Sequence, residues 1–247
     1  MITASIITKN EEMNITRCLN SLLWVDEIII VDSGSNDKTV QICKDFGCKI
    51  IETSWLGFGQ TKQLGVEAAK NDWILSIDAD EEVSLNLAHK IKDTLPSTTK
   101  KAFEIRRKSF YIDKLIKYSG WKNDYPVRLF NRKYAKFDSR KVHEKIILDC
   151  GAPGRIKECL NHFPFPNIET HIKKINLYST LGANALFERK KKYLFVYPFL
   201  AGLYKFFKTY FLRKGFLDGR EGLLLSLLSS LYVFLKYMKL WILWKQK

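Results

Sequence analysis

Hydrophobic and polar positions along the first hundred residues follow two different periods. Short apolar runs rich in β-branched residues are typical of strands, and they span 4–9, 27–33, 48–52 and 73–78. Between these runs apolar residues recur at helical spacing, over about 10–23, 35–46, 60–70 and 84–95. This alternation predicts an α/β fold in which a mostly parallel, doubly wound sheet is flanked by helices.

The pattern changes after the polar stretch at 96–99. Strand-like runs follow without regular helices between them, at 102–111, 126–132 and 142–148. From about Ile168 onward the chain has a helical pattern to its end. We therefore expect an α/β domain over residues 1–167 and a helical region over residues 168–247.

The amino-acid composition is typical of a folded protein with reduced cysteines. A chain of 247 residues with 46% hydrophobic content can bury a sizeable core, so general disorder is not expected. The first residues lack the basic and apolar segments of a secretory signal. The five cysteines are odd in number and show no zinc-binding spacing, so we expect reduced thiols in a cytosolic compartment.

The net charge of +15 is concentrated near the end of the chain, where residues 187–247 hold thirteen Lys and Arg against three Asp and Glu. A basic run at 189–192 precedes apolar residues at helical spacing, and a thirteen-residue uncharged stretch ends at Lys236. A membrane span needs about 20 apolar residues, and both segments are shorter. We expect helices that lie on an anionic membrane surface; the alternative is a helical core packed on the sheet.

Acidic residues end two of the predicted strands, at Asp32 and at Asp78 with Asp80 behind it. Carboxyl ends of strands form the ligand-binding edge of an open α/β sheet. If the chain stays extended, Asp78 and Asp80 lie on one side with Ala79 opposite. Two such carboxylates would be neutralised by Mg²⁺ or Mn²⁺ together with phosphate oxygens. The alternative is a polar turn whose acids simply begin the next helix.

Several ordered motifs resemble inverting family 2 glycosyltransferases, which have the GT-A fold, a Rossmann-like nucleotide-sugar-binding domain. SIITKNEE, VDSGSNDKT and DADE carry this resemblance. WLGFGQTKQLG, NDWILSIDADE, GWKNDYPVRLFNR and KVHEKI resemble the bacterial enzymes that add glucose to the lipopolysaccharide inner core by a β-1,4 linkage. The resemblance implies a nucleoside-diphosphate sugar donor, a divalent metal held by the D-x-D motif, and a single displacement at the anomeric carbon.

Donor-site roles follow from this resemblance. Asp80 would bind the metal, and Asp78 would face the ribose, a metal-bound water or the metal itself. Asp32 is placed to accept hydrogen bonds from the base or ribose, and Lys62 to meet a phosphate unless it is a solvated lysine. The rim of the nucleotide site would be formed by Thr8, Asn10 and Glu11, with helix capping as the alternative for Asn10.

Two further roles fall later in the chain. His143, in the VHE motif, resembles the histidine that often completes the metal site, although a lone histidine is more often structural. Inversion also needs a general base for the acceptor hydroxyl. The Glu-Asp pair that usually supplies this base is absent, so Asp124 is the first candidate and Glu144 the second.

The leading hypothesis is therefore transfer of a hexose, with UDP-glucose as the donor by resemblance alone. The acceptor would be a lipopolysaccharide core or related glycolipid, at the cytoplasmic face of the inner membrane, with the enzyme bound peripherally. Alternatives are a polyisoprenyl phosphate or protein acceptor, and a nucleotide-sugar-binding scaffold without catalysis. The charge alone would permit nucleic-acid binding, but long apolar stretches accompany it, and we expect no nucleic-acid partner.

Overall fold

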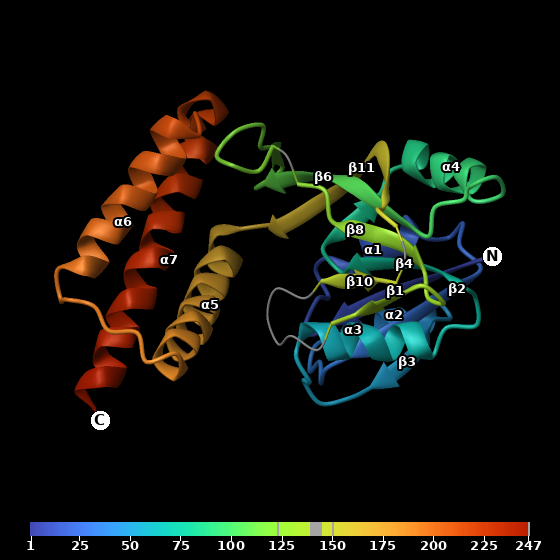
Figure 1. Ribbon diagram of the computed structural model, residues 1–247, viewed down its shortest axis with the longest axis horizontal. Coiled ribbons are helices and arrows are strands. Elements are labelled where there is room, and N and C mark those ends of the chain that lie inside the picture. The colour runs from blue at the N-terminus through green and yellow to red at the C-terminus, as the bar shows by residue number, and fades with distance from the viewer. Residues whose placement is uncertain (123, 139–144, 150, 247) are drawn as a thin grey trace. The chain divides into compact units, whose positions relative to one another are not determined.

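The structure is a computed structural model that describes residues 1–122, 124–138, 145–149 and 151–246. The chain forms two compact units (Figure 1). The sheet unit comprises Met1–Arg107 and Asp124–His162, and the helical unit comprises Lys108–Asn123 and Phe163–Lys247. The helical unit therefore takes a segment from the middle of the chain as well as the region after residue 167.

Four parallel strands form one half of the sheet, in the order β3-β2-β1-β4. They are β1 (Ile2–Thr8), β2 (Glu27–Asp32), β3 (Lys49–Glu52) and β4 (Trp73–Asp78). All four are short apolar runs, as expected of strands covered on both faces. Their carboxyl ends meet at one edge, where Thr8 pairs with Asp32 and Ile7 with Asp78. The predicted α/β fold with flanking helices is confirmed.

The other half of the sheet is antiparallel, so the sheet is mixed rather than mostly parallel. β8 (Val127–Asn131) pairs with β4, and the order continues through β6 (Ala102–Tyr111), β11 (Gly154–Phe165) and β5 (Glu81–Val83). Antiparallel neighbours need no helical crossover, which explains why the helical pattern stops after residue 99. Three short strands complete the set: β7 (Lys114–Leu115), β9 (Ala135–Phe137) and β10 (Ile146–Leu148).

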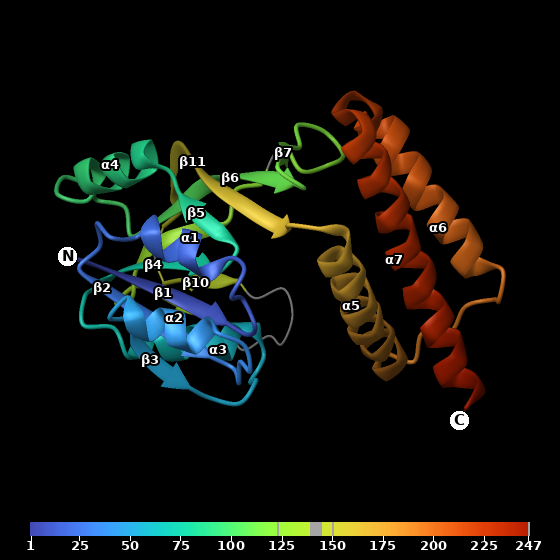
Figure 2. The same ribbon diagram turned by 180° about the vertical axis from the view of Figure 1, so that it is seen from behind.

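Helices cover both faces of the sheet. α1 (Ile15–Asn20), α2 (Thr39–Asp45) and α4 (Leu85–Thr94) contribute to one apolar cluster, and α3 (Phe58–Glu67) contributes to the cluster on the other face (Figures 1 and 2). Gly65 lets α3 approach β1 closely, because a Cβ there would lie 2.1 Å from the Ser5 hydroxyl. Ser84 caps α4, accepting a hydrogen bond from the Leu87 amide.

The helical unit contains three long helices, α5 (Ile168–Glu188), α6 (Tyr197–Phe207) and α7 (Gly219–Lys245). α7 runs beside both α5 and α6 (Figures 1 and 2). The expectation that the last apolar segment is too short to cross a membrane is wrong. Lys236 does not end the helix: the helical stretch Gly215–Lys245 is long enough to cross a membrane, and an 18-residue window within it has a mean hydropathy of 1.5.

Candidate active site

Asp32 organises the loop that follows β2. Its carboxylate accepts hydrogen bonds from the Thr8 hydroxyl at 3.0 Å, the Ser35 hydroxyl at 2.5 Å and the amides of Gly34 and Ser35. Gly34 adopts a φ of 85°, which favours glycine, and this conformation brings the two amides to the carboxylate. Asp32 is 2% exposed and therefore fixes the floor of any ligand site at this edge.

The loops after β1 and β2 are joined by hydrogen bonds. The Asn10 side chain accepts from the Asn36 amide, and the Ser35 hydroxyl accepts from the Asn10 amide, both at 2.8 Å. The Glu11 amide donates to the Thr39 hydroxyl. α1 begins only at Ile15, so the alternative that Asn10 caps this helix is wrong. Asn10 and Glu11 instead hold the two loops together at the carboxyl edge.

Asp78 lies between two cations. Lys62 Nζ is 2.9 Å from Oδ1, and Arg128 Nη2 is 2.5 Å from Oδ2. Lys62 is only 6% exposed, so the alternative of a solvated lysine is wrong. Burial by itself would raise the pKa of Asp78, but Arg128 and Lys62 outweigh it and hold that pKa well below its ordinary value. Asp78 is therefore an ionised carboxylate at the strand end.

The chain does not stay extended after Asp78. Ala79 and Asp80 form a turn, closed by a hydrogen bond from the Asp78 amide to Glu81 Oε2 at 2.9 Å. The expectation that period two places Asp78 and Asp80 on one side therefore fails. The alternative that these acids begin a helix is also wrong, because Glu81 belongs to β5 and α4 begins at Leu85.

Asp32 and Asp78 lie at the same edge but leave the sheet on opposite faces. Asp32 is aligned with Thr8, whereas Asp78 is aligned with Ile7, and neighbouring residues of a strand point to opposite faces. The contact of Asp78 with Lys62 of α3 agrees with this assignment. A ligand that reaches both acids would have to lie across the edge formed by β2, β1 and β4.

A chain of ion pairs runs from Asp78 to Asp124. Arg128 joins Asp78 to Glu81, with Nη2 2.5 Å from Glu81 Oε1, and Arg107 Nη1 lies 3.2 Å from the same oxygen. Arg107 then binds Asp124 Oδ2 through Nε at 2.7 Å and Nη2 at 2.5 Å. Glu81 is fully buried, and this burial raises its pKa although Arg128 opposes the shift.

Asp124 is fixed by both backbone and side chain. Its carbonyl accepts from the Arg107 amide at 2.9 Å, which forms an isolated bridge between the two residues. Both side-chain bonds from Arg107 fall on Oδ2. Among the described residues Oδ1 accepts no hydrogen bond, and the side chain is 40% exposed. The candidate base therefore has one oxygen held by Arg107, on a side chain that is partly exposed.

Asp80 lies near a histidine that sequence reasoning did not select. His162 of β11 pairs across the sheet with Glu81, and its Nε2 is 3.7 Å from Asp80 Oδ1. Burial lowers the pKa of His162 to about 4, although Asp80 opposes the shift. The imidazole is therefore neutral at pH 7.

The residues selected from the sequence fall into two groups. Thr8, Asn10, Glu11, Asp32, Lys62, Asp78, Asp80 and Asp124 all belong to the sheet unit. His143 and Glu144 lie outside the described residues, so their proposed roles stay predictions. Arg107, Glu81 and His162 were missed because their partners are distant in sequence and no local spacing connects them.

Comparisons with known proteins identify the family to which this chain belongs. The sequence model of the Glycosyl transferase family 2 matches residues 3–191. An uncharacterised glycosyltransferase of Rickettsia felis is 34% identical over 97% of this chain and 89% of its own length. The lipopolysaccharide core biosynthesis glycosyltransferase LpsC of Rhizobium meliloti is 27% identical over 97% of this chain and 92% of its own.

Among solved structures, TarS of S. aureus has a TM-score of 0.48 and 14% identity over 87% of this chain and 45% of its own. That likeness is too distant to support an argument about function. The match of the family model and the identity to the curated relatives are sufficient. The chain belongs to family 2 of the glycosyltransferases, and it is therefore an enzyme of the transferase class.

Proposed function

We propose that this enzyme transfers a hexose, glucose, from UDP-glucose to a lipopolysaccharide core or related glycolipid, with inversion at the anomeric carbon. The observation that carries the proposal is the chain of ion pairs from Lys62 through Asp78, Arg128, Glu81 and Arg107 to Asp124. It joins acids at the nucleotide edge of the sheet to a carboxylate suited to activate an acceptor. The similarity to LpsC supports the acceptor class.

Charge balance supports a divalent cation that enters together with a diphosphate donor. Taken as ionised, the carboxylates of Asp78, Asp80, Glu81 and Asp124 outnumber the cations Lys62, Arg107 and Arg128 by one. A diphosphate adds further negative charge, so a divalent cation would have to enter with it. Lys62 is the cation of this group on α3, and it would shift from Asp78 toward a phosphate oxygen when the donor binds.

The described residues fit a metal held mainly by substrate. They contain no cluster of three His, Cys, Asp or Glu side chains that would hold an ion without help. Mg²⁺ typically takes one or two protein carboxylates and fills its other positions with phosphate oxygens and water. Asp80 would supply that carboxylate, with Asp78 or His143 as further ligands. When bound, Mg²⁺ or Mn²⁺ would offset the charge that develops on the leaving diphosphate.

Asp124 would act as the general base. Its Oδ1 would take the proton of the acceptor hydroxyl while that oxygen attacks the anomeric carbon from the side opposite the diphosphate. The bond from the sugar to the diphosphate breaks, and its electron pair leaves with the phosphate oxygen. Arg107 would hold Oδ2 and so orient the carboxylate. Glu144 remains the alternative base.

The helical unit would attach the enzyme to the inner face of the plasma membrane. Basic residues and exposed apolar side chains occur together in α6 and α7, including Leu203 at 67% and Leu200 at 58% exposure. Lysines near an anionic surface contribute about 1 kcal/mol each. Attachment would confine the enzyme to the surface that carries a lipid-linked acceptor. Nucleic acid is not a proposed partner.

The donor is tested by thermal-shift measurements with UDP-glucose, other nucleotide sugars and Mn²⁺, because ligand binding to the native state raises its melting temperature. We expect the largest rise with UDP-glucose and Mn²⁺ together. Asp80→Asn should abolish the metal-dependent part of the rise. Asp72→Asn is the matched control, since Asp72 lies at the amino end of β4 and pairs with Lys133.

The acceptor is tested by incubating donor with truncated lipopolysaccharide cores, polyisoprenyl phosphate or protein extracts. We expect a product with inverted anomeric configuration on the lipopolysaccharide core alone. A product on polyisoprenyl phosphate or protein would replace the acceptor assignment. Donor binding without turnover on any of the three would leave a nucleotide-sugar-binding scaffold. Full metal-dependent activity in Asp80→Asn would overturn the metal assignment.

A further inference from the structure

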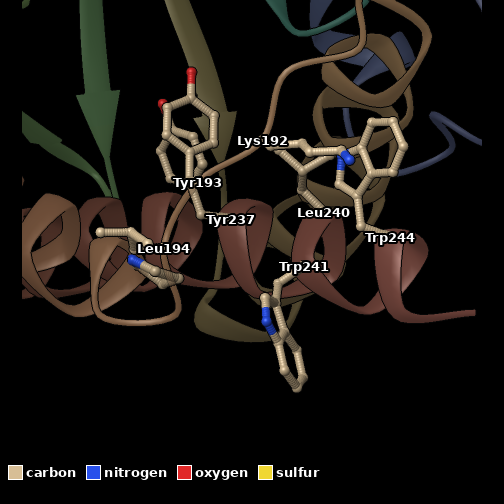
Figure 3. Close-up of a pocket in the computed structure, with 8 residues that line it drawn as sticks. Lys192, Tyr193, Leu194, Tyr237, Leu240, Trp241 and Trp244 are labelled. Carbon is tan, nitrogen blue, oxygen red and sulfur yellow. The ribbon is translucent and has the colours of Figure 1, made fainter.

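The end of α7 borders a cavity of about 150 Å³ within the helical unit (Figure 3). Four side chains of α7 form its floor at helical spacing i, i+3, i+4 and i+7, and the segment before α6 supplies the rest together with Pro198 in the first turn of α6. The α7 residues are Tyr237, Leu240, Trp241 and Trp244, and the others are Lys192, Tyr193, Leu194 and Pro198. Figure 3 shows Tyr193 beside Tyr237, and Lys192 beside Trp244.

The cavity exists because α6 is too short to cover the whole of α7. The two helices are antiparallel: Gly202 contacts Ser230 and Phe234, and the rings of Tyr197 and Tyr237 are 4.8 Å apart. α6 begins at Tyr197, so beyond Tyr237 the end of α7 is met by the preceding segment, residues 189–196, and by Phe187 of α5, whose ring centroid lies 4.6 Å from that of Trp244. The Trp244 indole N–H donates to the Lys191 carbonyl at 2.7 Å and anchors that segment.

Cations border the aromatic rings of the cavity. Lys192 Nζ lies 4.6 Å from the Trp244 ring, and Lys245 Nζ lies 5.3 Å from the Trp241 ring. The sequence places no Asp or Glu between residues 189 and 217 or between 222 and 247. A sugar-binding site usually needs carboxylate or amide groups to accept hydrogen bonds from hydroxyls. This cavity offers cations and aromatic rings, which favours an anionic group.

Exposed apolar side chains continue from the mouth of the cavity. Leu194 is 80% exposed, and Phe195 and Val196 are each 52% exposed. The stripe then continues along α6 through Phe199, Leu203 and Phe207. Trp and Tyr concentrate at the interface between lipid and water, and lysines extend from there to the headgroups. Hydrocarbon chains would therefore meet apolar surface immediately beside the cationic rim.

We propose that this cavity binds the phosphate-bearing headgroup of an anionic glycerophospholipid, with the acyl chains along the exposed face of α6. Lys192 would pair with the phosphate, and Tyr193, Tyr237 and Trp244 would pack against the glycerol. The inference rests on the membrane attachment proposed above. It adds a specific binding site that distinguishes one lipid headgroup from another. It places the aromatic end of α7 at headgroup level.

The test uses the full chain and short-chain lipids below their micelle-forming concentration, with binding measured by calorimetry. We expect dihexanoylphosphatidylglycerol to bind at least about fivefold more tightly than dihexanoylphosphatidylcholine, because both headgroups carry the phosphate but only choline adds a positive charge, which Lys192 would repel; this is the size of effect that one lysine contributes near a headgroup. Lys192→Gln should remove this preference. Lys190→Gln is the matched control, because it removes the same charge from the same basic run but Lys190 does not line the cavity.

Equal losses in the two lysine variants would overturn the proposal, because they would show diffuse attraction rather than a site. Equal affinity of the wild-type chain for the two lipids would also overturn it. Tyr237→Leu, which keeps the apolar floor but removes the ring, should weaken both lipids about equally. Absence of binding to any phosphatidylglycerol vesicle would defeat membrane attachment itself. The donor thermal shift reports separately on the transferase.

Discussion

The two units of this glycosyltransferase hold their charges in opposite ways. In the sheet unit Lys62, Glu81 and Arg128 are nearly inaccessible, and each is paired with a partner of opposite sign. In the helical unit most basic side chains are exposed among exposed apolar residues. A buried ion pair adds little net stability, because removing both charges from water costs about as much free energy as their attraction returns. The buried pairs of the sheet unit thus fix side chains at the carboxyl edge of the sheet, whereas most basic side chains of the helical unit are open to solvent.

Both units also contain a buried aspartate that orders a loop. Asp32 and Asp218 are each 2% exposed. Asp32 accepts from Thr8 and the loop after β2, and Asp218 accepts from the amides of Lys117 and Tyr118 and from the Ser119 hydroxyl. Both aspartates order a loop in the same way, but only Asp32 lies at the carboxyl edge of the sheet. Asp32 is therefore a candidate binding residue because of its position, whereas Asp218 has a structural role.

The largest expected effect is on catalysis, at the end of the ion-pair chain. Asp124→Asn should lower the turnover rate by about 10²–10⁴-fold, because a general base contributes this much, while donor affinity stays within about twofold. Steady-state transfer and UDP thermal shift would be measured side by side. The control is Asp113→Asn, an exposed position with a φ of 63° that asparagine tolerates. Near-normal turnover, with activity lost in Glu144→Gln, would transfer the role to Glu144.

Much of the sheet unit was predictable because its signals are local. The apolar runs of β1, β2 and β4 are continuous, and Ser84 precedes α4 at a capping position. β5 and β11 were not predicted. β5 has only three residues, and β11 includes Pro164 and places polar and apolar residues without regular alternation. In the antiparallel half of the sheet, the strand-like runs at 102–111 and 126–132 predicted β6 and β8, whereas β5 and β11 had no reliable sequence signal.

The site was most readily predictable where its residues lie at strand ends. Asp32, Asp78 and Asp80 follow apolar runs, so their positions could be inferred. Pairings such as Arg107 with Glu81, 26 residues apart, or Ser84 with Cys159, 75 apart, depend on strand order. A single sequence does not reveal that order. The continuous length of α7 was missed because Lys236 was taken as the end of the apolar segment.

The next largest effect is on stability. Arg128→Met should lower the unfolding free energy by roughly 3–5 kcal/mol, because it removes a partner from the fully buried Glu81 and from the partly buried Asp78. Arg132→Met is the control, since Arg132 lies 4.0 Å from Asp72 at a more exposed position, and it should cost no more than about 1 kcal/mol. Urea unfolding measures both. If both variants lost the same unfolding free energy, buried and exposed charges would not differ in their contribution to stability, and the contrast between the two units would fail.

A smaller effect separates the two loop-ordering aspartates. Asp218→Asn and Asp32→Asn should each lower the unfolding free energy by roughly 1–3 kcal/mol. In each variant the NH₂ group of asparagine replaces a carboxylate oxygen that accepts hydrogen bonds from backbone amides and hydroxyls, so these donors lose their acceptor. Only Asp32→Asn should also weaken UDP binding, measured by calorimetry. If Asp218→Asn weakened UDP binding to the same degree, the contrast between the two aspartates would fail.

The smallest effect concerns His171 of the helical unit, which is stacked on Phe165 and lies 3.0 Å from the Tyr111 hydroxyl. Burial, with a further contribution from Lys174, lowers its pKa to about 4. The folded state therefore keeps the ring neutral, while the unfolded state takes up a proton below about pH 6.5. The stabilisation that comes from keeping His171 neutral is therefore complete above about pH 6.5 and is lost as the pH falls toward 4. By pH 5 the loss in unfolding free energy is about 2 kcal/mol.

Urea unfolding at pH 7 and pH 5 measures this loss, and His171→Phe should reduce it. His162 of the sheet unit also has its pKa lowered to about 4, so part of the pH dependence should remain in the variant. If the two units unfold as separate transitions, the part removed by His171→Phe should belong only to the helical one. An unchanged pH dependence in the variant would show that His171 titrates alike in the folded and unfolded chain. Burial in the helical unit would then not exclude water from this ring as the structure requires.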